Sequence, residues 1–280
     1  MVIESLFNPF TVKKKPWEMF IAGFFYSFIG LLLSYFVFRD SAGLLTVFLI
    51  VLATLPLLYT TVTNEEELDL KYNKEIILLK EHTKVLVFLM FLFLGITVAL
   101  ALAYIILPSE IVGSVFSVQH EAIGKVNSQI QGNVIKLDLF SKIFLNNLKV
   151  LFFCIIFSFL YGTGAIFILT WNASVVAVAI GNFFKSELAQ LASVVGLPSL
   201  GAYFGIASIS FFRYMTHGLF EMAAYFVAGL AGGIISIALI KHNLENETVL
   251  IDALDLILLS LGILLIGSFV EVYITPLLFA

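Results

Sequence analysis

The sequence predicts an all-α, polytopic integral membrane helical bundle of about seven spans (six to eight), and three observations lead to this fold class. Of 280 residues, 61% are apolar and only 12% are charged, and the mean hydropathy is +1.07. Soluble domains are nearer to about half apolar and a quarter charged. Apolar runs of bilayer length also recur along the chain. Finally, the net charge is −4 with no basic stripe, so we expect no nucleic-acid partner.

The first element is a hairpin of two spans, predicted over residues 17–38 and 44–62. A signal peptide has a shorter apolar core of about 7–15 residues, so the first run is predicted to stay in the membrane. Residues 64–84 form the most polar stretch, which predicts a short helix extending the hairpin into water. We therefore interpret residues 1–84 as an N-terminal transmembrane hairpin with a cytoplasmic helical extension.

Lysine positions predict the orientation. The lysines at 13–15 and the four lysines between 71 and 84 fall on one side of an intact hairpin, and Arg39 falls on the other. Because basic residues concentrate on the cytoplasmic side, the N-terminus is predicted to be cytoplasmic. The expected location is the cell membrane, with multiple passes through the lipid bilayer.

The remainder, residues 85–280, is predicted to be the membrane core. Its first span covers residues 85–107, and residues 109–148 are too polar to cross, although apolar residues recur there at helical spacing. That pattern is typical of a non-spanning, partly amphipathic segment along the headgroups or on the spans.

The C-terminal half is predicted to contain one or more short or broken helices. Spans are expected over residues 150–169, 200–212, 217–240 and 254–278. Arg213 divides the second of these from the third. Residues 174–184 are too few to cross, so they indicate a re-entrant or broken helix, or half of a longer span running on to residue 195.

Three ionisable residues, Arg213, His217 and Glu221, follow one another at intervals of four inside an apolar region. Each step of four turns a helix by only about 40°, so all three share one face. A charge deep in lipid costs about 2.5–3.5 kcal/mol on the insertion scale, so these side chains are expected to face protein or water. The same face continues through three small residues that permit close helix packing, namely Ala224, Ala228 and Gly232.

Asparagines and glycines complete the candidate cluster. Asn146 and Asn147 precede the fourth predicted span and Asn172 follows it; they are helix caps or buried partners for the charged stripe. Gly162 and Gly164 indicate tight helix contact. Gly218 either allows close packing or breaks the helix between His217 and Glu221.

These residues resemble a known family. Over about residues 140–240 the chain resembles the stage II sporulation protein M family. The resemblance rests on two asparagines before an apolar span with Gly162 and Gly164, then Asn172, then the run His217-Gly218-Leu219-Phe220-Glu221 with its small-residue tail. Asn172 is followed by alanine where the family usually has glycine, and the N-terminal hairpin looks like an addition. The resemblance implies a distant, archaeal-type member, the polytopic fold and the buried motif. The family's namesake resembles a scaffold for envelope-remodelling enzymes.

Three functions compete. The leading hypothesis is a non-enzymatic scaffold or assembly factor whose His-Gly-x-Phe-Glu motif organises the bundle, with other membrane or envelope proteins as partners; small-residue faces permit a homodimer equally well. The alternative is a transporter or permease component with His217 and Glu221 as a proton or substrate site. An intramembrane hydrolase ranks third. We expect no metal and no cofactor, because four histidines without ligand spacing do not make a metal site.

Overall fold

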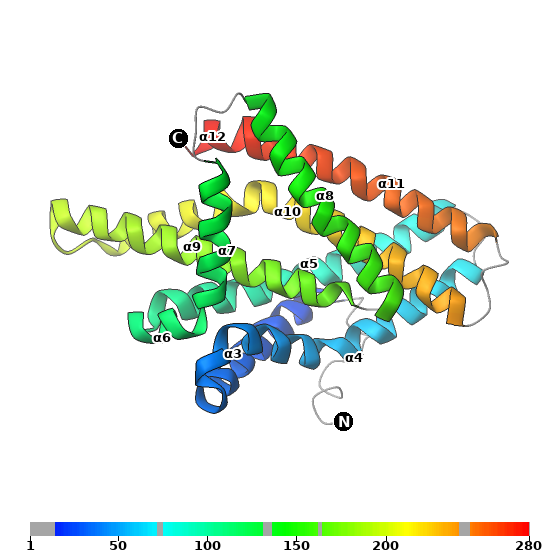
Figure 1. Cartoon of the computed structure of the whole chain (residues 1–280), viewed down its shortest axis with the longest axis horizontal. Coiled ribbons are helices and arrows are strands. Elements are labelled where there is room, and N and C mark those ends of the chain that lie inside the picture. Colours follow the sequence, from blue (N-terminus) through cyan, green and yellow to red (C-terminus); the bar gives the residue numbers. More distant parts are fainter. Residues whose placement is uncertain (1–14, 72–74, 131–135, 162–163, 241–246, 280) are drawn as a thin grey trace.

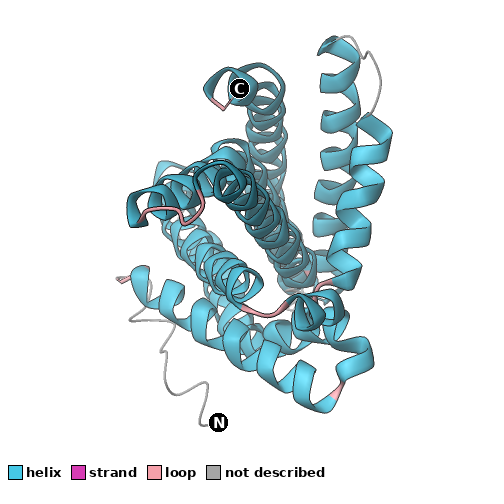
Figure 2. Ribbon diagram, turned by 90° about the vertical axis from the view of Figure 1, so that its left-hand side faces the viewer, coloured by secondary structure: helices cyan, strands magenta, loops and turns pink. Residues whose placement is uncertain are grey.

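The structure is a computed structural model that describes residues 15–71, 75–130, 136–161, 164–240 and 247–279, and every regular element in these ranges is a helix (Figures 1 and 2). The elements are α3 (Trp17–Val37), η1 (Arg39–Ser41), α4 (Ala42–Lys71), α5 (Glu75–Ile106), α6 (Ser109–Val115), α7 (Ser117–Ile130), α8 (Lys136–Tyr161), α9 (Ala165–Val195), α10 (Leu200–Ile240), α11 (Glu247–Phe269), the π-helical turn η2 (Val270–Ile274) and α12 (Thr275–Leu278). Seven segments are long and apolar enough to cross a membrane. The all-α, multi-span prediction is confirmed.

The fourth predicted span, residues 150–169, is wrong in its bounds. Helix α8 already begins at Lys136, and its polar side chains at Lys142, Asn146 and Lys149 lie exposed, so the helix accommodates them without burying charge. The chain then turns before α9, where a methyl group on Gly164 would lie 2.2 Å from the carbonyl oxygen of Phe157. Only a residue without a side chain fits this close approach.

Two predicted interruptions are absent. Residues 174–184 belong to the continuous helix α9, as the longer-span alternative proposed, and Arg213 lies inside the single 41-residue helix α10. The irregularity in this half of the chain lies instead in the last span, where η2 separates α11 from α12. The polar stretch 64–84 is also not one short helix, because its described parts extend α4 and α5.

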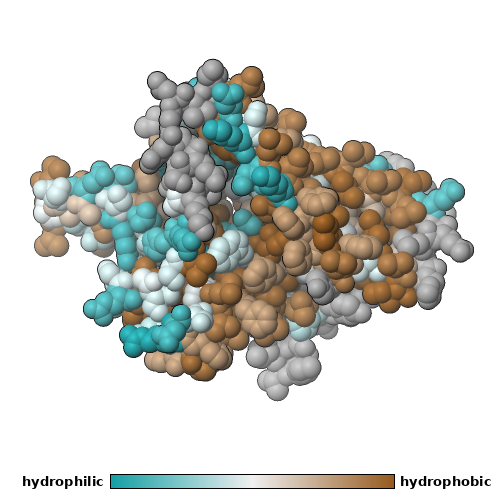
Figure 3. Space-filling model, viewed as in Figure 1, coloured by the Kyte–Doolittle hydropathy of each residue, from teal (hydrophilic) through white to brown (hydrophobic). Residues whose placement is uncertain are grey.

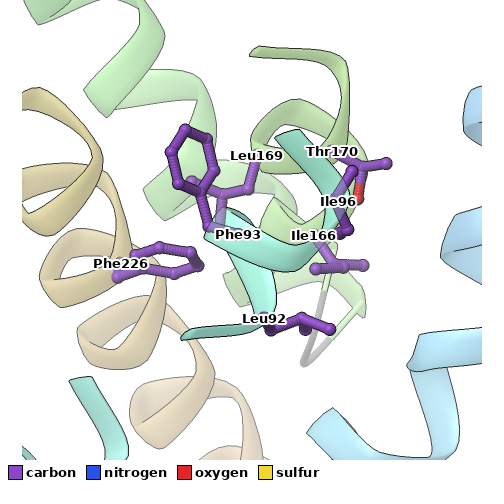
Figure 4. A pocket seen from close by; sticks show the side chains of 7 residues that line it. All are labelled: Leu92, Phe93, Ile96, Ile166, Leu169, Thr170 and Phe226. Atoms are coloured by element: carbon purple, nitrogen blue, oxygen red, sulfur yellow. The ribbon is translucent and has the colours of Figure 1, made fainter. Parts of the chain in front are cut away.

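Helix α10 is the centre of the bundle and packs against α4, α5, α8, α9 and α11. The side chains between the middle of α10 and its neighbours α5 and α9 are closely packed. The small void enclosed by residues of α5, α9 and α10, among them Phe93, Ile166 and Phe226, measures about 10 Å³ (Figure 4). That is about the size of one water molecule's probe sphere, so this void has no room for a substrate.

One end of the bundle carries its polar surface and a projection. Helix α7 runs across the direction of the long helices, and hydrophilic residues gather over α6, α7 and the start of α8, whereas the rest of the visible face is mostly hydrophobic (Figures 1 and 3). Beyond this polar end extend the last part of α9 and the first part of α10 (Figure 1). We call residues 188–209 the projecting hairpin; none of them is buried.

Candidate functional site

The predicted charged stripe lies on an unbroken helix. Helix α10 continues through Gly218, so Arg213, His217 and Glu221 keep the four-residue spacing that puts them on one face. All three side chains are partly buried. None of them lies fully in solvent, which agrees with the prediction that they point toward protein.

The C-terminal segment supplies most of the partners. Arg213 donates from Nη1 to the backbone carbonyl of Phe279 at 3.3 Å, and His217 Nδ1 lies 3.4 Å from Thr275 Oγ1. The next residue of the stripe, Glu221, lies opposite Glu271 of the same segment, close enough for the two carboxyl groups to interact electrostatically. The two segments are antiparallel, so the partner moves back by four residues for each four residues along α10: Phe279 for Arg213, Thr275 for His217 and Glu271 for Glu221.

Glu221 is the residue at which three helices meet. The amide of Asn147, on α8, donates a hydrogen bond to Glu221 Oε1, and Glu271 in η2 is near enough to interact electrostatically with the same side chain. Asn147 is only 9% exposed. A direct hydrogen bond between the two carboxyl groups would require a proton on one of them, because two ionised carboxylates offer only acceptors.

Local backbone features bring Glu271 to this position. It lies in the π-helical turn η2, and such turns are frequent at functional sites because the extra residue re-aims the side chains around it. One turn earlier, a methyl group on Gly267 would lie 3.0 Å from Phe220 Cβ and 3.4 Å from Glu221 Cγ. The missing side chain at Gly267 lets α11 approach α10 beside Glu221.

The bond at Thr275 fixes the tautomer of His217. Thr275 Oγ1 donates its single proton to the Val270 carbonyl at 3.2 Å. Its oxygen is then left as an acceptor for His217, so the imidazole carries its proton on Nδ1. Nε2 of His217 is consequently the nitrogen with a free lone pair.

The other predicted polar residues do not join this cluster. Asn146 is exposed on α8, next to Asn147 but on a different face. Asn172 donates to the carbonyl of Ile168, one turn back on its own helix, at 2.8 Å. Of the three asparagines, only Asn147 forms a hydrogen bond with a residue of the charged stripe, Glu221, because its side chain faces α10.

The predicted packing residues divide in the same way. Ala224 and Ala228 are fully buried, and a methyl group on Gly232 would lie 2.5 Å from the carbonyl oxygen of Ile155 on α8. The packing role expected of Gly218 is not seen, since a methyl group there would meet nothing within 4 Å. Gly162 lies outside the described residues.

Two further polar pairs lie elsewhere in the bundle. His82 Nε2 on α5 is 2.9 Å from Asp252 Oδ2 near the start of α11, and His82 is 1% exposed. At the polar end, Tyr104 Oη lies 2.9 Å from Nε2 of His120 on α7. In the part of the chain that the structure describes, no three His, Cys, Asp or Glu side chains gather in a way that would hold a metal ion.

Glu271 is the main residue that the sequence reasoning missed. The available signal was an acidic residue enclosed by Val270 and Val272 within the last apolar span. By the argument applied to Glu221, an acid in such a place must be answered by protein. Its partner could not be identified without the register between α10 and the C-terminal segment.

Residues 84–276 match the family described as Stage II sporulation protein M, a longer range than the residues 140–240 over which we expected the resemblance. The uncharacterized protein MJ0793 of the archaeon Methanocaldococcus jannaschii is 30% identical to this chain over 144 residues, covering 49% of this chain and 71% of that protein. No solved structure matches the chain. The matched range contains Asn147, Glu221 and Glu271.

Proposed function

The chain belongs to the stage II sporulation protein M family, and from that premise we propose that it is a non-enzymatic membrane scaffold or assembly factor. It binds another membrane or envelope protein at its projecting hairpin. The bundle held together around Glu221 is the fixed base of this scaffold. The observation that carries the proposal is the apolar, charge-free surface of the hairpin beyond the bundle.

Helix length supports a hairpin outside the lipid. At 1.5 Å per residue, the 41 residues of α10 span about 60 Å, twice the roughly 30 Å hydrocarbon core of a bilayer. The buried residues of α10 begin at Ser210 and end at Ala238, so none of its first ten residues is buried in the bundle. That part extends past the polar helix α7 (Figure 1). We place α7 at the level of the headgroups because its polar and apolar residues suit that region.

The surface of the hairpin is suited to a protein partner. Residues 188–212 contain no charged side chain. At its tip Leu197 is 96% exposed, Leu200 is 81% exposed and Phe204 is 77% exposed. Large apolar side chains that are exposed outside lipid are typical of an interaction site. With the N-terminus in the cytoplasm, as the lysines predict, five crossings put the hairpin on the external side, where envelope proteins are found.

Photocrosslinking tests this proposal. A photoreactive amino acid at Leu197 is expected to give a discrete adduct with one membrane or envelope protein in the cells that produce this chain, and Phe204→Glu should reduce its yield several-fold. The matched control is Leu258 on α11, which is 65% exposed but lies on a span and faces lipid. An adduct of twice 31.0 kDa would identify a homodimer. Equal adducts at both positions, or none at Leu197, would contradict the scaffold.

One observation favours the alternative, a transporter or permease component. The pairing of two carboxyl groups, Glu221 and Glu271, with His217 one turn away from Glu221 on the same face, is typical of a proton site within a membrane. In proteoliposomes containing a pH-sensitive dye, such a protein would carry protons down an imposed gradient, and Glu221→Gln would abolish the flux while the protein stays folded. Flux with this behaviour would replace the scaffold proposal.

A further inference from the structure

A groove in the surface of the bundle has the features of a lipid site. It encloses about 200 Å³ between α5, α9 and α10, and its walls come from ten residues of these helices. The lining residues are Thr97, Val98, Ala101, Leu102, Ile105, Ile180, Phe184, Ala207, Ser210 and Phe211. Leu102 is 42% exposed on the outside of its span, so the groove opens toward the hydrocarbon of the bilayer.

The walls of the groove suit a hydrocarbon chain. Eight of the ten lining residues are apolar, and the hydroxyl of Ser210 is already donated to the carbonyl of Ile206 at 2.7 Å. The hydroxyl of Thr97 is fully buried and has no hydrogen-bond partner. Neither hydroxyl therefore offers an accessible polar group, and the surface of the groove is apolar.

A lysine is the sequence neighbour of one of the groove's lining residues. Lys185 follows the lining residue Phe184 on α9, and its Nζ lies 5.0 Å from the centroid of the Tyr104 ring on α5. Among the described residues no carboxylate is within ion-pair distance of Lys185. Tyr104 in turn reaches His120 on α7, the helix at the headgroup level. The positive charge is therefore close to the polar end of the bundle and has no acidic partner among the residues that the structure describes.

We propose that this groove binds one anionic phospholipid, with an acyl chain between α5, α9 and α10 and the headgroup phosphate at Lys185. The cavity has room for part of one chain and not for a whole lipid, so the rest of the molecule stays in the surrounding bilayer. Charge complementarity selects the anionic headgroup, because a lysine near a membrane surface gains attraction from negative lipids. A lipid at this place would join the base of the projecting hairpin to the bundle.

Native mass spectrometry of the full chain tests the proposal, with phosphatidylglycerol as the anionic probe and phosphatidylcholine as the zwitterionic control. One phosphatidylglycerol is expected to stay bound at lipid concentrations where phosphatidylcholine is lost. Lys185→Gln should weaken phosphatidylglycerol binding about fivefold and leave phosphatidylcholine unchanged. Lys149→Gln is the matched control, because Lys149 is an exposed lysine on α8 away from the groove residues.

Filling the groove separates this site from general attraction to negative lipids. Ala207→Trp inserts a large side chain from α10 and should abolish retained lipid of either kind; Leu102→Trp does so from α5 if the first variant does not fold. Melting temperatures without added lipid show which variants are folded. Three results would each overturn the proposal. The first is lipid retention that survives both groove variants, and the second is equal retention of both lipids by the wild type. The third is an equal effect of Lys185→Gln and Lys149→Gln.

Discussion

Two glycines on the central helix offer a matched test of how the bundle is packed. On α10, a methyl group at Gly232 would lie 2.5 Å from the carbonyl oxygen of Ile155 and 3.0 Å from Ser158 Cβ, whereas a methyl group at Gly218 would meet nothing within 4 Å. Carbon atoms in ordinary contact are about 3.5–4.0 Å apart. Gly232→Ala therefore forces α8 away from α10, and Gly218→Ala does not.

The expected difference follows from this geometry. Both substitutions replace glycine in a helix interior, so both gain about 0.4–1 kcal/mol from the restricted unfolded chain, and this gain cancels in the comparison. Over-packing costs about 1–3 kcal/mol, which at about 2–4 °C per kcal/mol puts the melting temperature of Gly232→Ala about 2–12 °C below that of Gly218→Ala. Gly218→Ala itself should melt slightly above the wild type.

Thermal unfolding in detergent, followed by circular dichroism or a thiol-reactive dye that reports exposure of the buried Cys154, measures the difference. Ligand-free protein in one detergent is needed for all three forms, because bound lipid stabilises the folded state. Equal melting temperatures for the two variants would refute the close contact of α8 with α10. A melting temperature of Gly218→Ala below that of the wild type would refute the open space beside Gly218.

Three further outcomes are expected from the polar contacts. Glu221→Leu should lower the unfolding free energy by about 1–2 kcal/mol while Glu221→Gln keeps most of it, since the amide still accepts a hydrogen bond; unchanged stability in the leucine variant would contradict the structural role of the motif. A double-mutant cycle between Asn147→Ala and Glu221→Leu should give a coupling of about 0.6–1.7 kcal/mol, and additive effects would mean that the two side chains do not interact. Asp252→Ala removes an acceptor from the buried His82 and should cost about 1–3 kcal/mol in thermal unfolding, whereas the exposed neighbour Asp255→Ala should change little.

The candidate site was predictable in part. The four-residue spacing of Arg213, His217 and Glu221 was enough to put them on one face of a helix, because helical geometry is local. Their partners were not predictable, apart from Asn147. Thr275 and Glu271 lie fifty or more residues away in sequence, and the contact depends on the antiparallel register of two helices, which no local pattern encodes.

Helix boundaries follow the same division. Apolar length alone predicted the number of spans, about seven, yet it misplaced the limits of the fourth, left α9 undecided and divided α10 into two spans at Arg213. A charged residue ends a span only if it cannot reach a partner, and the carbonyl of Phe279 provides one for Arg213. Similarly, the polar start of α8 continues its span because those side chains remain exposed. Which residues have partners is a property of the packed bundle.

The amino-acid order alone determined that this is an all-helical membrane protein with about seven crossings and a single charged stripe. The reason is that lipid offers no hydrogen bonds, so each apolar segment must satisfy its own backbone as a helix, whatever its neighbours do. Tertiary structure alone decided that Glu221 meets Asn147 and Glu271, and that the α9–α10 hairpin extends beyond the bundle. Helix pairing inside a bilayer depends on shape and on a few polar contacts, because lipid tails give no hydrophobic preference for one neighbour over another.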